Sequence, residues 1–173
     1  MSMEILCSAE EIARQIARLG REITEFYRNK PLTLVSLMNG ALPFAADLMR
    51  AIDLPLYVDT VSVSSYHDRK SSGELNFRSS LKLPPEGRHI LLADEVLDTG
   101  YTLACVAEYF RRRGAASVRT AVMVEKIRPR PDGVAHADWT GVVLPDRYLV
   151  GYGLDADELY RNLPCIAALM QEK

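Results

Sequence analysis

Short apolar segments alternate with amphipathic helical patterns along this chain, and that alternation limits the fold more than any other feature of the sequence. Strands are predicted for residues 32–37, 56–66, 89–93, 117–124, 140–144 and 148–150. Helices are predicted for residues 8–28, 42–52 and 102–113. Helices that connect strands in this way are typical of an α/β fold, in which helices flank a mainly parallel sheet on both faces.

The first predicted helix carries signals at its start and along one face. Ser8 followed by Glu11 forms a capping box, in which each side chain can satisfy a free backbone N–H of the other residue. The apolar side chains that follow recur at helical spacing and share one face: Ile12, Ile16, Leu19, Ile23 and Phe26. We therefore expect this face to be buried against the rest of the protein.

The composition is that of a single globular domain, which we assign to residues 1–173. Hydrophobic residues make up 48% of the chain, charged residues make up 25%, and the formal net charge is −2, which excludes a disordered chain and gives no electrostatic case for a nucleic-acid partner. The arginine run at 111–113 is a local exception. No stretch approaches the ~18 apolar residues that a membrane span requires.

The cysteines and the N-terminal sequence indicate where such a chain would work. Cys7, Cys105 and Cys165 are widely spaced and fit neither a disulfide framework nor a zinc site. The first residues contain acidic side chains and no basic region followed by an apolar stretch, so no secretory signal is visible. We expect a reduced, cytoplasmic setting and no membrane partner.

Ligands of open parallel sheets bind beyond the carboxyl ends of the strands. In this sequence those places follow Leu37, Ala93 and Val124, and each is occupied by polar residues. Between the second and third predicted strands, residues 67–74 are polar, with no apolar period, which is typical of a long functional loop.

The segment 90–103 carries the most specific chemistry. An apolar strand runs into the acidic pair Asp94–Glu95, and then a turn containing Asp98, Thr99 and Gly100 opens a helix. The free N–H groups of a helix start, two hydroxyls and a glycine suit a phosphate. Carboxylates suit hydroxyl groups or a metal instead. A phosphate with vicinal hydroxyls nearby is a ribose phosphate.

This segment resembles the phosphoribosyl pyrophosphate signature of type I phosphoribosyltransferases, in which two acids and two apolar residues precede Asp-Thr-Gly-x-Thr. The resemblance extends to the hypoxanthine–guanine branch through the blocks 64–74, 125–126, 144–155 and 160–164. It implies the type I phosphoribosyltransferase fold. In that fold a mainly parallel central sheet flanked by helices carries a small hood built from the chain termini and a flexible catalytic loop, here about residues 65–80.

The resemblance implies roles for the residues of the signature. Asp98 would be the catalytic base that takes the proton from purine N7. Asp94 and Glu95 would hold the ribose hydroxyls, directly or through a magnesium shell. The cradle of the 5′-phosphate would consist of Thr99, Gly100, Tyr101 and Thr102.

Three further positions are implied to bind the purine. Lys126 would donate to the oxygen at C6, and because an ammonium group can only donate, it favours a 6-oxo purine over adenine. Tyr148 would stack on the base, and the main chain of Leu149 would meet its edge.

The remaining implied roles concern diphosphate, metal and loop. Met38, Asn39 and Gly40 would form the pyrophosphate loop together with Arg161. Relatives usually carry Lys or Arg at the position of Asn39, so Asn39 departs from the pattern, and a cis Met38–Asn39 peptide is a hypothesis. Asp155 would bind Mg²⁺, and Ser65 and Tyr66 would belong to the flexible loop.

The implied activity is Mg²⁺-dependent purine salvage, in which hypoxanthine or guanine and 5-phosphoribosyl 1-pyrophosphate give nucleoside monophosphate and pyrophosphate. The partners would be these small molecules and further copies of the chain, as a homodimer or homotetramer. Two alternatives stay open at this point. One is a preference for xanthine, and the other is a nucleotide-sensing, RNA-binding regulator on the same fold.

Overall fold

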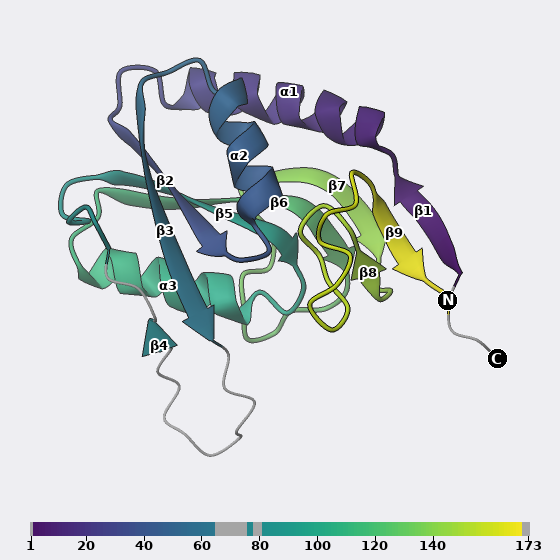
Figure 1. Ribbon diagram of the computed structural model, residues 1–173. Helices are drawn as coiled ribbons and strands as arrows, with labels where there is room; N and C mark the ends of the chain where they lie inside the picture. Colours follow the sequence, from purple (N-terminus) through teal and green to yellow (C-terminus); the bar gives the residue numbers. More distant parts are fainter. Residues whose placement is uncertain (1, 65–75, 78–80, 171–173) are drawn as a thin grey trace.

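The computed structural model describes residues 2–64, 76–77 and 81–170. A six-stranded sheet with the order β4-β3-β2-β5-β6-β7 forms its centre (Figure 1). Its strands are β2 (Leu32–Met38), β3 (Leu56–Ser64), β4 (Asn76–Phe77), β5 (His89–Leu97), β6 (Ser117–Ile127) and β7 (Trp139–Pro145). Only β4 runs antiparallel to its neighbour, so the predicted α/β fold with a mainly parallel sheet is confirmed.

Helices cover both faces of this sheet. Figure 1 shows α1 (Ala9–Phe26) and α2 (Leu42–Ala51) above it and α3 (Tyr101–Arg112) below it. One hydrophobic core lies under α1 and α2 and continues to the C-terminal strands, and the other lies between the sheet and α3. The three helical segments read from the sequence therefore occur with the predicted boundaries shifted by one or two residues.

At the start of α1, one of the two hydrogen bonds of the expected capping box is present. The Ser8 hydroxyl accepts a hydrogen bond from the backbone N–H of Glu11, at 3.3 Å. The Glu11 carboxylate binds Gln15 and Arg14 instead of returning to Ser8, because helical spacing places these donors on its own face. Ile12, Ile16, Leu19 and Ile23 are buried as predicted, whereas Phe26 is 39% exposed and its ring meets Trp139 edge-on.

Two strands that lead to the site, β5 and β6, are longer than predicted. We expected β5 to end at Ala93, but it continues to Leu97, because Asp94, Val96 and Leu97 pair with β6. The acidic pair therefore belongs to the strand itself. In the same way β6 extends beyond Val124, so Lys126 also lies on a strand rather than after it.

A second, three-stranded sheet joins the two ends of the chain. It consists of β1 (Met3–Cys7), β9 (Ile166–Leu169) and β8 (Leu149–Val150), in that order, and lies at one end of the central sheet (Figure 1). This sheet is the hood that the family resemblance implied. Strand patterns in the sequence did not reveal β1, because three of its five residues are exposed and its pairing depends on a segment more than 150 residues away.

Part of the predicted flexible loop, including Ser65 and Tyr66, lies outside the described residues. Among those that are described, Asp59 holds the chain where it returns from this region, since its carboxylate accepts hydrogen bonds from the backbone N–H groups of Lys82 and Leu83 at 2.9 and 3.0 Å. Within the same described ranges, no helix is long and apolar enough to cross a membrane.

The phenol of Tyr27 generates a stability prediction. Tyr27 is fully buried, and its hydroxyl has no hydrogen-bond partner within the described chain. Because an unpaired buried hydroxyl is destabilising, Tyr27→Phe should raise the free energy of unfolding by about 1 kcal/mol. Chemical denaturation monitored by circular dichroism measures this change.

Tyr152→Phe is the matched control, because the Tyr152 hydroxyl donates to Asp47 at 2.7 Å. In that variant the free energy of unfolding should fall by about 1 kcal/mol. Equal losses in the two variants would contradict the account of Tyr27.

Candidate active site

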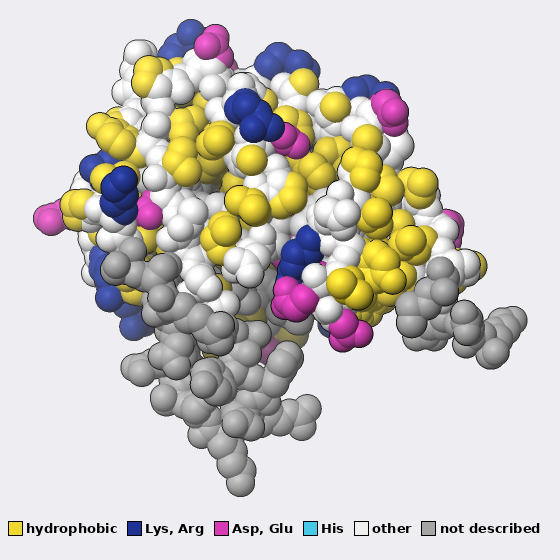
Figure 2. All heavy atoms as spheres, viewed as in Figure 1, with side chains coloured by type: hydrophobic (Ala, Val, Ile, Leu, Met, Phe, Trp, Pro, Cys, Tyr) yellow, Lys and Arg dark blue, Asp and Glu magenta, His cyan; other side chains and the backbone are white. Residues whose placement is uncertain are grey.

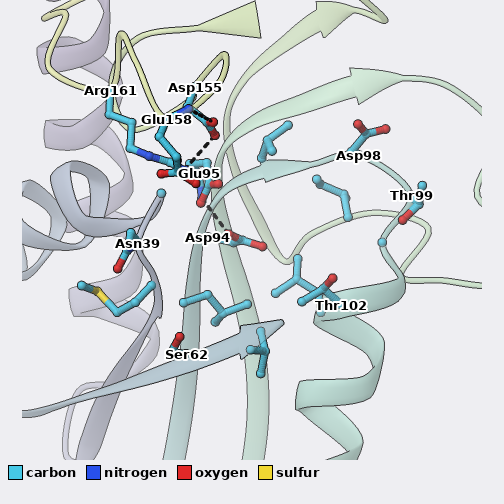
Figure 3. A pocket seen from close by; sticks show the side chains of 18 residues that line it. Asn39, Ser62, Asp94, Glu95, Asp98, Thr99, Thr102, Asp155, Glu158 and Arg161 are labelled. Atoms are coloured by element: carbon cyan, nitrogen blue, oxygen red, sulfur yellow. Dashed lines mark hydrogen bonds and ion pairs between the residues drawn. The ribbon is translucent and has the colours of Figure 1, made fainter. Parts of the chain in front are cut away.

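A pocket of about 520 Å³ opens at the carboxyl ends of β2, β3 and β5. Figure 3 shows that Asp98, Thr99 and Thr102 lie at one end, Asp155, Glu158 and Arg161 lie at the other, and Asp94 and Glu95 lie between them. Segments far apart in the sequence therefore share one cavity. Of the residues singled out from the sequence, those that line it are Met38, Asn39, Gly40, Asp94, Glu95, Asp98, Thr99, Gly100, Thr102, Asp155 and Arg161.

The turn between β5 and α3 has the geometry of an anion site. Gly100 precedes the first residue of α3 with a φ of 74°, which glycine adopts without strain. The first turn of a helix leaves backbone N–H groups free, and Thr99, Gly100 and Thr102 at this helix start line the pocket. Tyr101 is not among the described lining residues: its backbone N–H donates to the Thr99 hydroxyl at 3.4 Å, and the residue is 44% exposed.

The acidic pair occupies the middle of the pocket and is electrostatically unfavourable by itself. The backbone N–H of Glu95 donates to the Asp94 carboxylate at 3.0 Å, and the Glu95 side chain lies so close to Gly40 that a Cβ there would overlap it. Loss of water around the carboxyl group, reinforced by the neighbouring Glu95 charge, raises the pKa of Asp94 well above its usual range. Such a pair is suited to a ligand that supplies hydroxyl donors or a cation.

The loop after β2 has a cis peptide bond and a close contact with the C-terminal segment. Its Met38–Asn39 peptide bond is cis, as the hypothesis from the sequence required. Gly153, with a φ of 97°, approaches the Gly40 carbonyl so closely that any side chain at 153 would overlap it. The C-terminal segment is thereby fixed against the predicted pyrophosphate loop.

Arg161 is the one basic side chain among the described residues that line the pocket. Its guanidinium donates to the Gly153 carbonyl at 2.7 Å and pairs with Asp155 and Glu158, both at 2.9 Å. Glu158 did not emerge from the sequence, because it lines the pocket only through a left-handed backbone (φ 63°) that has no sequence signature. The predicted metal ligand and the predicted diphosphate ligand are therefore bonded to each other in this structure.

Asp98 lies in a cluster of four charged side chains. Lys126 Nζ is 3.1 Å from the Asp98 carboxylate and 3.4 Å from that of Asp146. Arg128 hydrogen-bonds to Asp98 and lies 3.4 Å from Asp146. Arg128 and Asp146 were not singled out from the sequence, because their proximity to Asp98 arises from the pairing of β5 with β6 and of β6 with β7.

The predicted purine ligands lie beside the pocket rather than in its lining. Lys126 is largely buried and reaches Asp98, as described above. Tyr148 is 59% exposed and Leu149 is buried in β8. Tyr148 directly precedes β8, and its carbonyl accepts a hydrogen bond from the backbone N–H of Leu169 in β9 at 3.0 Å, so both residues belong to the hood.

Comparison with known proteins identifies the family. The model of the phosphoribosyl transferase domain matches residues 2–155. The chain belongs to the phosphoribosyltransferase family. It is 40% identical to the hypoxanthine-guanine phosphoribosyltransferase of Bacillus subtilis over 167 residues, which cover 96% of this chain and 92% of that protein. It is 38% identical to the enzyme of the same name from Streptococcus pneumoniae over 170 residues, which cover 98% and 94% of the two chains.

Solved structures agree with this assignment. The crystal structure of a hypoxanthine phosphoribosyltransferase from Staphylococcus aureus superposes with a TM-score of 0.91 at 36% identity, and the match covers 96% of this chain and 91% of that one. This phosphoribosyltransferase therefore has the fold of the hypoxanthine–guanine branch, including the sheet and the hood.

The charge of the pocket is relevant to whether it can bind a metal cation. Among the described residues, five carboxylates line the pocket of this phosphoribosyltransferase (Asp94, Glu95, Asp98, Asp155 and Glu158), against the single guanidinium of Arg161. No group of three or more acidic, histidine or cysteine side chains is placed to hold a metal within the described ranges. This donor set fits Mg²⁺, which binds one or two protein carboxylates and takes its other oxygens from water and phosphate.

The raised pKa of Asp94 predicts how stability depends on pH. Between its ordinary pKa and the raised one, the folded protein retains a proton that the unfolded chain has lost, so the free energy of unfolding falls as pH rises. Asp94→Asn removes this effect and should raise Tm by about 2–4 °C at pH 8. The gain should become small near about pH 4, where the acid is protonated in the folded protein and still about half protonated in the unfolded chain.

Thermal unfolding from pH 4 to 8 would measure this difference. Asp132→Asn is the control, since Asp132 is exposed and away from the pocket lining. A Tm difference that stays constant over the whole range would contradict the assignment to Asp94.

Proposed function

We propose that this protein transfers the ribose 5-phosphate group of 5-phosphoribosyl 1-pyrophosphate to hypoxanthine or guanine. The observation that carries the proposal is the juxtaposition of the anion-binding turn at 98–102 with the Asp94–Glu95 pair in one pocket. An anion site beside two carboxylates is complementary to a phosphorylated sugar. Relatives named hypoxanthine-guanine phosphoribosyltransferase at 38–40% identity support the choice of base.

In this proposal each part of the pocket has one task. The backbone N–H groups and hydroxyls of Thr99 and Thr102 bind the 5′-phosphate, and Asp94 and Glu95 accept the ribose hydroxyl hydrogen bonds. Purine N9 attacks C1 of the ribose as the bond from C1 to the pyrophosphate oxygen breaks. The proton leaves N7 for the carboxylate of Asp98, which lines the pocket at the end where the base enters.

Magnesium belongs to the same proposal. Asp155 would hold Mg²⁺ directly, with Asp94 and Glu95 reaching it through water. The ion, when bound, supplies positive charge for the diphosphate oxygens. Because Asp155 is paired with Arg161 at 2.9 Å, a cation at Asp155 would also release Arg161 toward the leaving diphosphate. Asn39 adds amide hydrogen bonds but no charge, so Arg161 is the main basic contact for that group among the described residues.

Base selectivity is assigned to the edge formed by Lys126, Tyr148 and Leu149. Lys126 already contacts Asp98, so one base could accept from Lys126 at O6 and give its N7 proton to Asp98. The exposed ring of Tyr148 would stack on the base, which contributes ~1–3 kcal/mol. The RNA-binding alternative finds little support, because Arg112 is paired with Glu108 and Arg113 stacks on Tyr109.

Self-association completes the proposal. Figure 2 shows hydrophobic side chains spread over the α1 and α2 side of the molecule. Exposed apolar residues on these helices are Phe26, Leu42 and Met49, and on β3 they are Tyr57 and Val58. We expect a homodimer or homotetramer in the cytoplasm, and sedimentation velocity would measure its size.

A base panel tests the proposed function. Initial rates with hypoxanthine, guanine, xanthine and adenine at saturating 5-phosphoribosyl 1-pyrophosphate and Mg²⁺ should be highest for hypoxanthine or guanine. A dominant rate with xanthine would favour the sister specificity. No pyrophosphate release with any base, together with a mobility shift of RNA, would favour the regulator.

Asp98→Asn should lower kcat by about 100-fold or more, because general-base catalysis contributes factors of that order. The affinity for 5-phosphoribosyl 1-pyrophosphate should change far less, since the turn and the acidic pair remain. Single-turnover kinetics and calorimetry measure the two quantities. Asp146→Asn is the control from the same charged cluster, outside the pocket lining, and a similar loss in both variants would remove the assignment to Asp98.

Lys126→Ala should reduce the preference for hypoxanthine over adenine by about 10-fold or more. In the proposal this preference arises because the buried Lys126 ammonium group donates to O6 of the base. The measurement is the ratio of kcat/KM for the two bases. If the preference survived in a folded variant, the specificity determinant would lie elsewhere.

A further inference from the structure

The side chain of Arg130 is 4% exposed and binds backbone carbonyls on two sides of the active site. Its Nε donates to the Asp98 carbonyl at 2.7 Å, and Nη2 donates to the Leu97 carbonyl at 3.0 Å and to the carbonyl of Lys126. Nη1 donates to the Ala135 carbonyl at 2.9 Å. One guanidinium thus joins the end of β5, the end of β6 and the segment that follows β6.

The residues joined in this way are those to which the proposed reaction assigns proton transfer and base recognition. Asp98 and Lys126 are 28 positions apart, and their side chains meet at 3.1 Å. The pairing of β5 with β6 ends at Leu97 and Glu125, which directly precede Asp98 and Lys126 in the sequence. Beyond that point the sheet no longer fixes the spacing of the two backbones, and the described bonds of Arg130 span the gap.

The buried charge of Arg130 has a counterion. Glu125, whose side chain is 9% exposed, lies 3.6 Å from Nη1. Burial opposes ionisation of Glu125, but hydrogen bonds with His136 at 2.6 Å and Thr140 at 3.0 Å outweigh it, and the pKa of Glu125 lies below its usual value. A compensated guanidinium can remain buried, so the arrangement is stable without substrate.

The segment after β6 also supports the phosphate turn. The backbone N–H of Val134 donates to the Gly100 carbonyl at 3.1 Å. Gly133 lies so close to Thr99 and Gly100 that a Cβ at 133 would overlap their backbone. Arg130 therefore supports the phosphate turn in two ways. It binds the Asp98 carbonyl directly, and through the Ala135 carbonyl it holds the segment that contacts Gly100.

We propose that Arg130 is a positioning residue that sets the distance between the Asp98 carboxylate and the Lys126 ammonium group, and thereby couples catalysis to base selection. The inference rests on the proposed function, because it assigns meaning to that distance. The positioning role requires an arginine. A planar guanidinium with five donors can bind four carbonyls at once, whereas a lysine ammonium group has three donors at one point.

The test compares Arg130→Lys with the unaltered enzyme. A misplacement of about 1 Å in an active site can cost ~100-fold in rate, so kcat with hypoxanthine should fall by at least 10-fold. The ratio of kcat/KM for hypoxanthine to that for adenine should fall in parallel, because Lys126 shifts as well. A role confined to stability would lower Tm and leave both quantities unchanged per folded molecule.

Arg18→Lys is the matched control. Arg18 also donates to backbone carbonyls, those of Thr140 and Gly141 in β7, but it is not among the pocket-lining residues. The Arg18→Lys variant should be less stable than the unaltered enzyme. Its kcat and its base preference should stay within twofold of the unaltered values. A fall of kcat in Arg130→Lys without a change in base preference, or values within twofold of this control, would overturn the proposal.

A second variant covers the case in which Arg130→Lys does not fold. The double variant Glu125→Gln with Arg130→Gln leaves no unpaired buried charge, and it should show the same joint loss. An unaltered protein without turnover on any base would reject the proposed function, and this inference with it. Turnover in the unaltered protein together with an unaffected double variant would reject the positioning role alone.

Discussion

The parallel pairing of β2 with β5 is the constraint on which the site depends. These strands pair from Leu32 with His89 to Ser36 with Ala93 and then separate, whereas β5 stays paired with β6 as far as Leu97. The pocket opens where β5 leaves β2. One wall is therefore the loop at 38–40 and the other is the acidic pair with the turn at 98–102. The strand order also reverses here, which is where open parallel sheets bind ligands.

The charges of this pocket are arranged for a ligand at the expense of the free protein. Asp94 and Glu95 are adjacent acids, and burial of the Asp94 carboxyl group, reinforced by the neighbouring Glu95 charge, raises the pKa of Asp94. At the other end of the pocket Arg161 is paired with Asp155 and Glu158. Stability is commonly lower where function requires such groupings.

Two connections between distant segments keep these parts in register. The segment at 151–161 touches the loop after β2 through Gly153 and Gly40, and six residues between 151 and 160 adopt positive φ angles to follow this path. The segment after β6 supports the turn after β5 through Arg130, Gly133 and Val134. Both contacts are made largely by the backbone, which leaves little trace in side-chain patterns.

Local periodicity and a contiguous motif in the sequence are enough to predict the α/β class, the three helices, most central strands and the signature at 94–102. Through a family resemblance the sequence also indicated many of the residues that line the pocket, though not Glu158, and raised the hypothesis of a cis Met38–Asn39 peptide, which is cis in the structure. The tertiary structure decided that the acidic pair lies on β5, that β1 joins the C-terminal strands, and that Arg128, Arg130, Asp146 and Glu158 surround the predicted residues. These features follow from strand pairing and backbone conformation between remote segments, and no local pattern of residues encodes them.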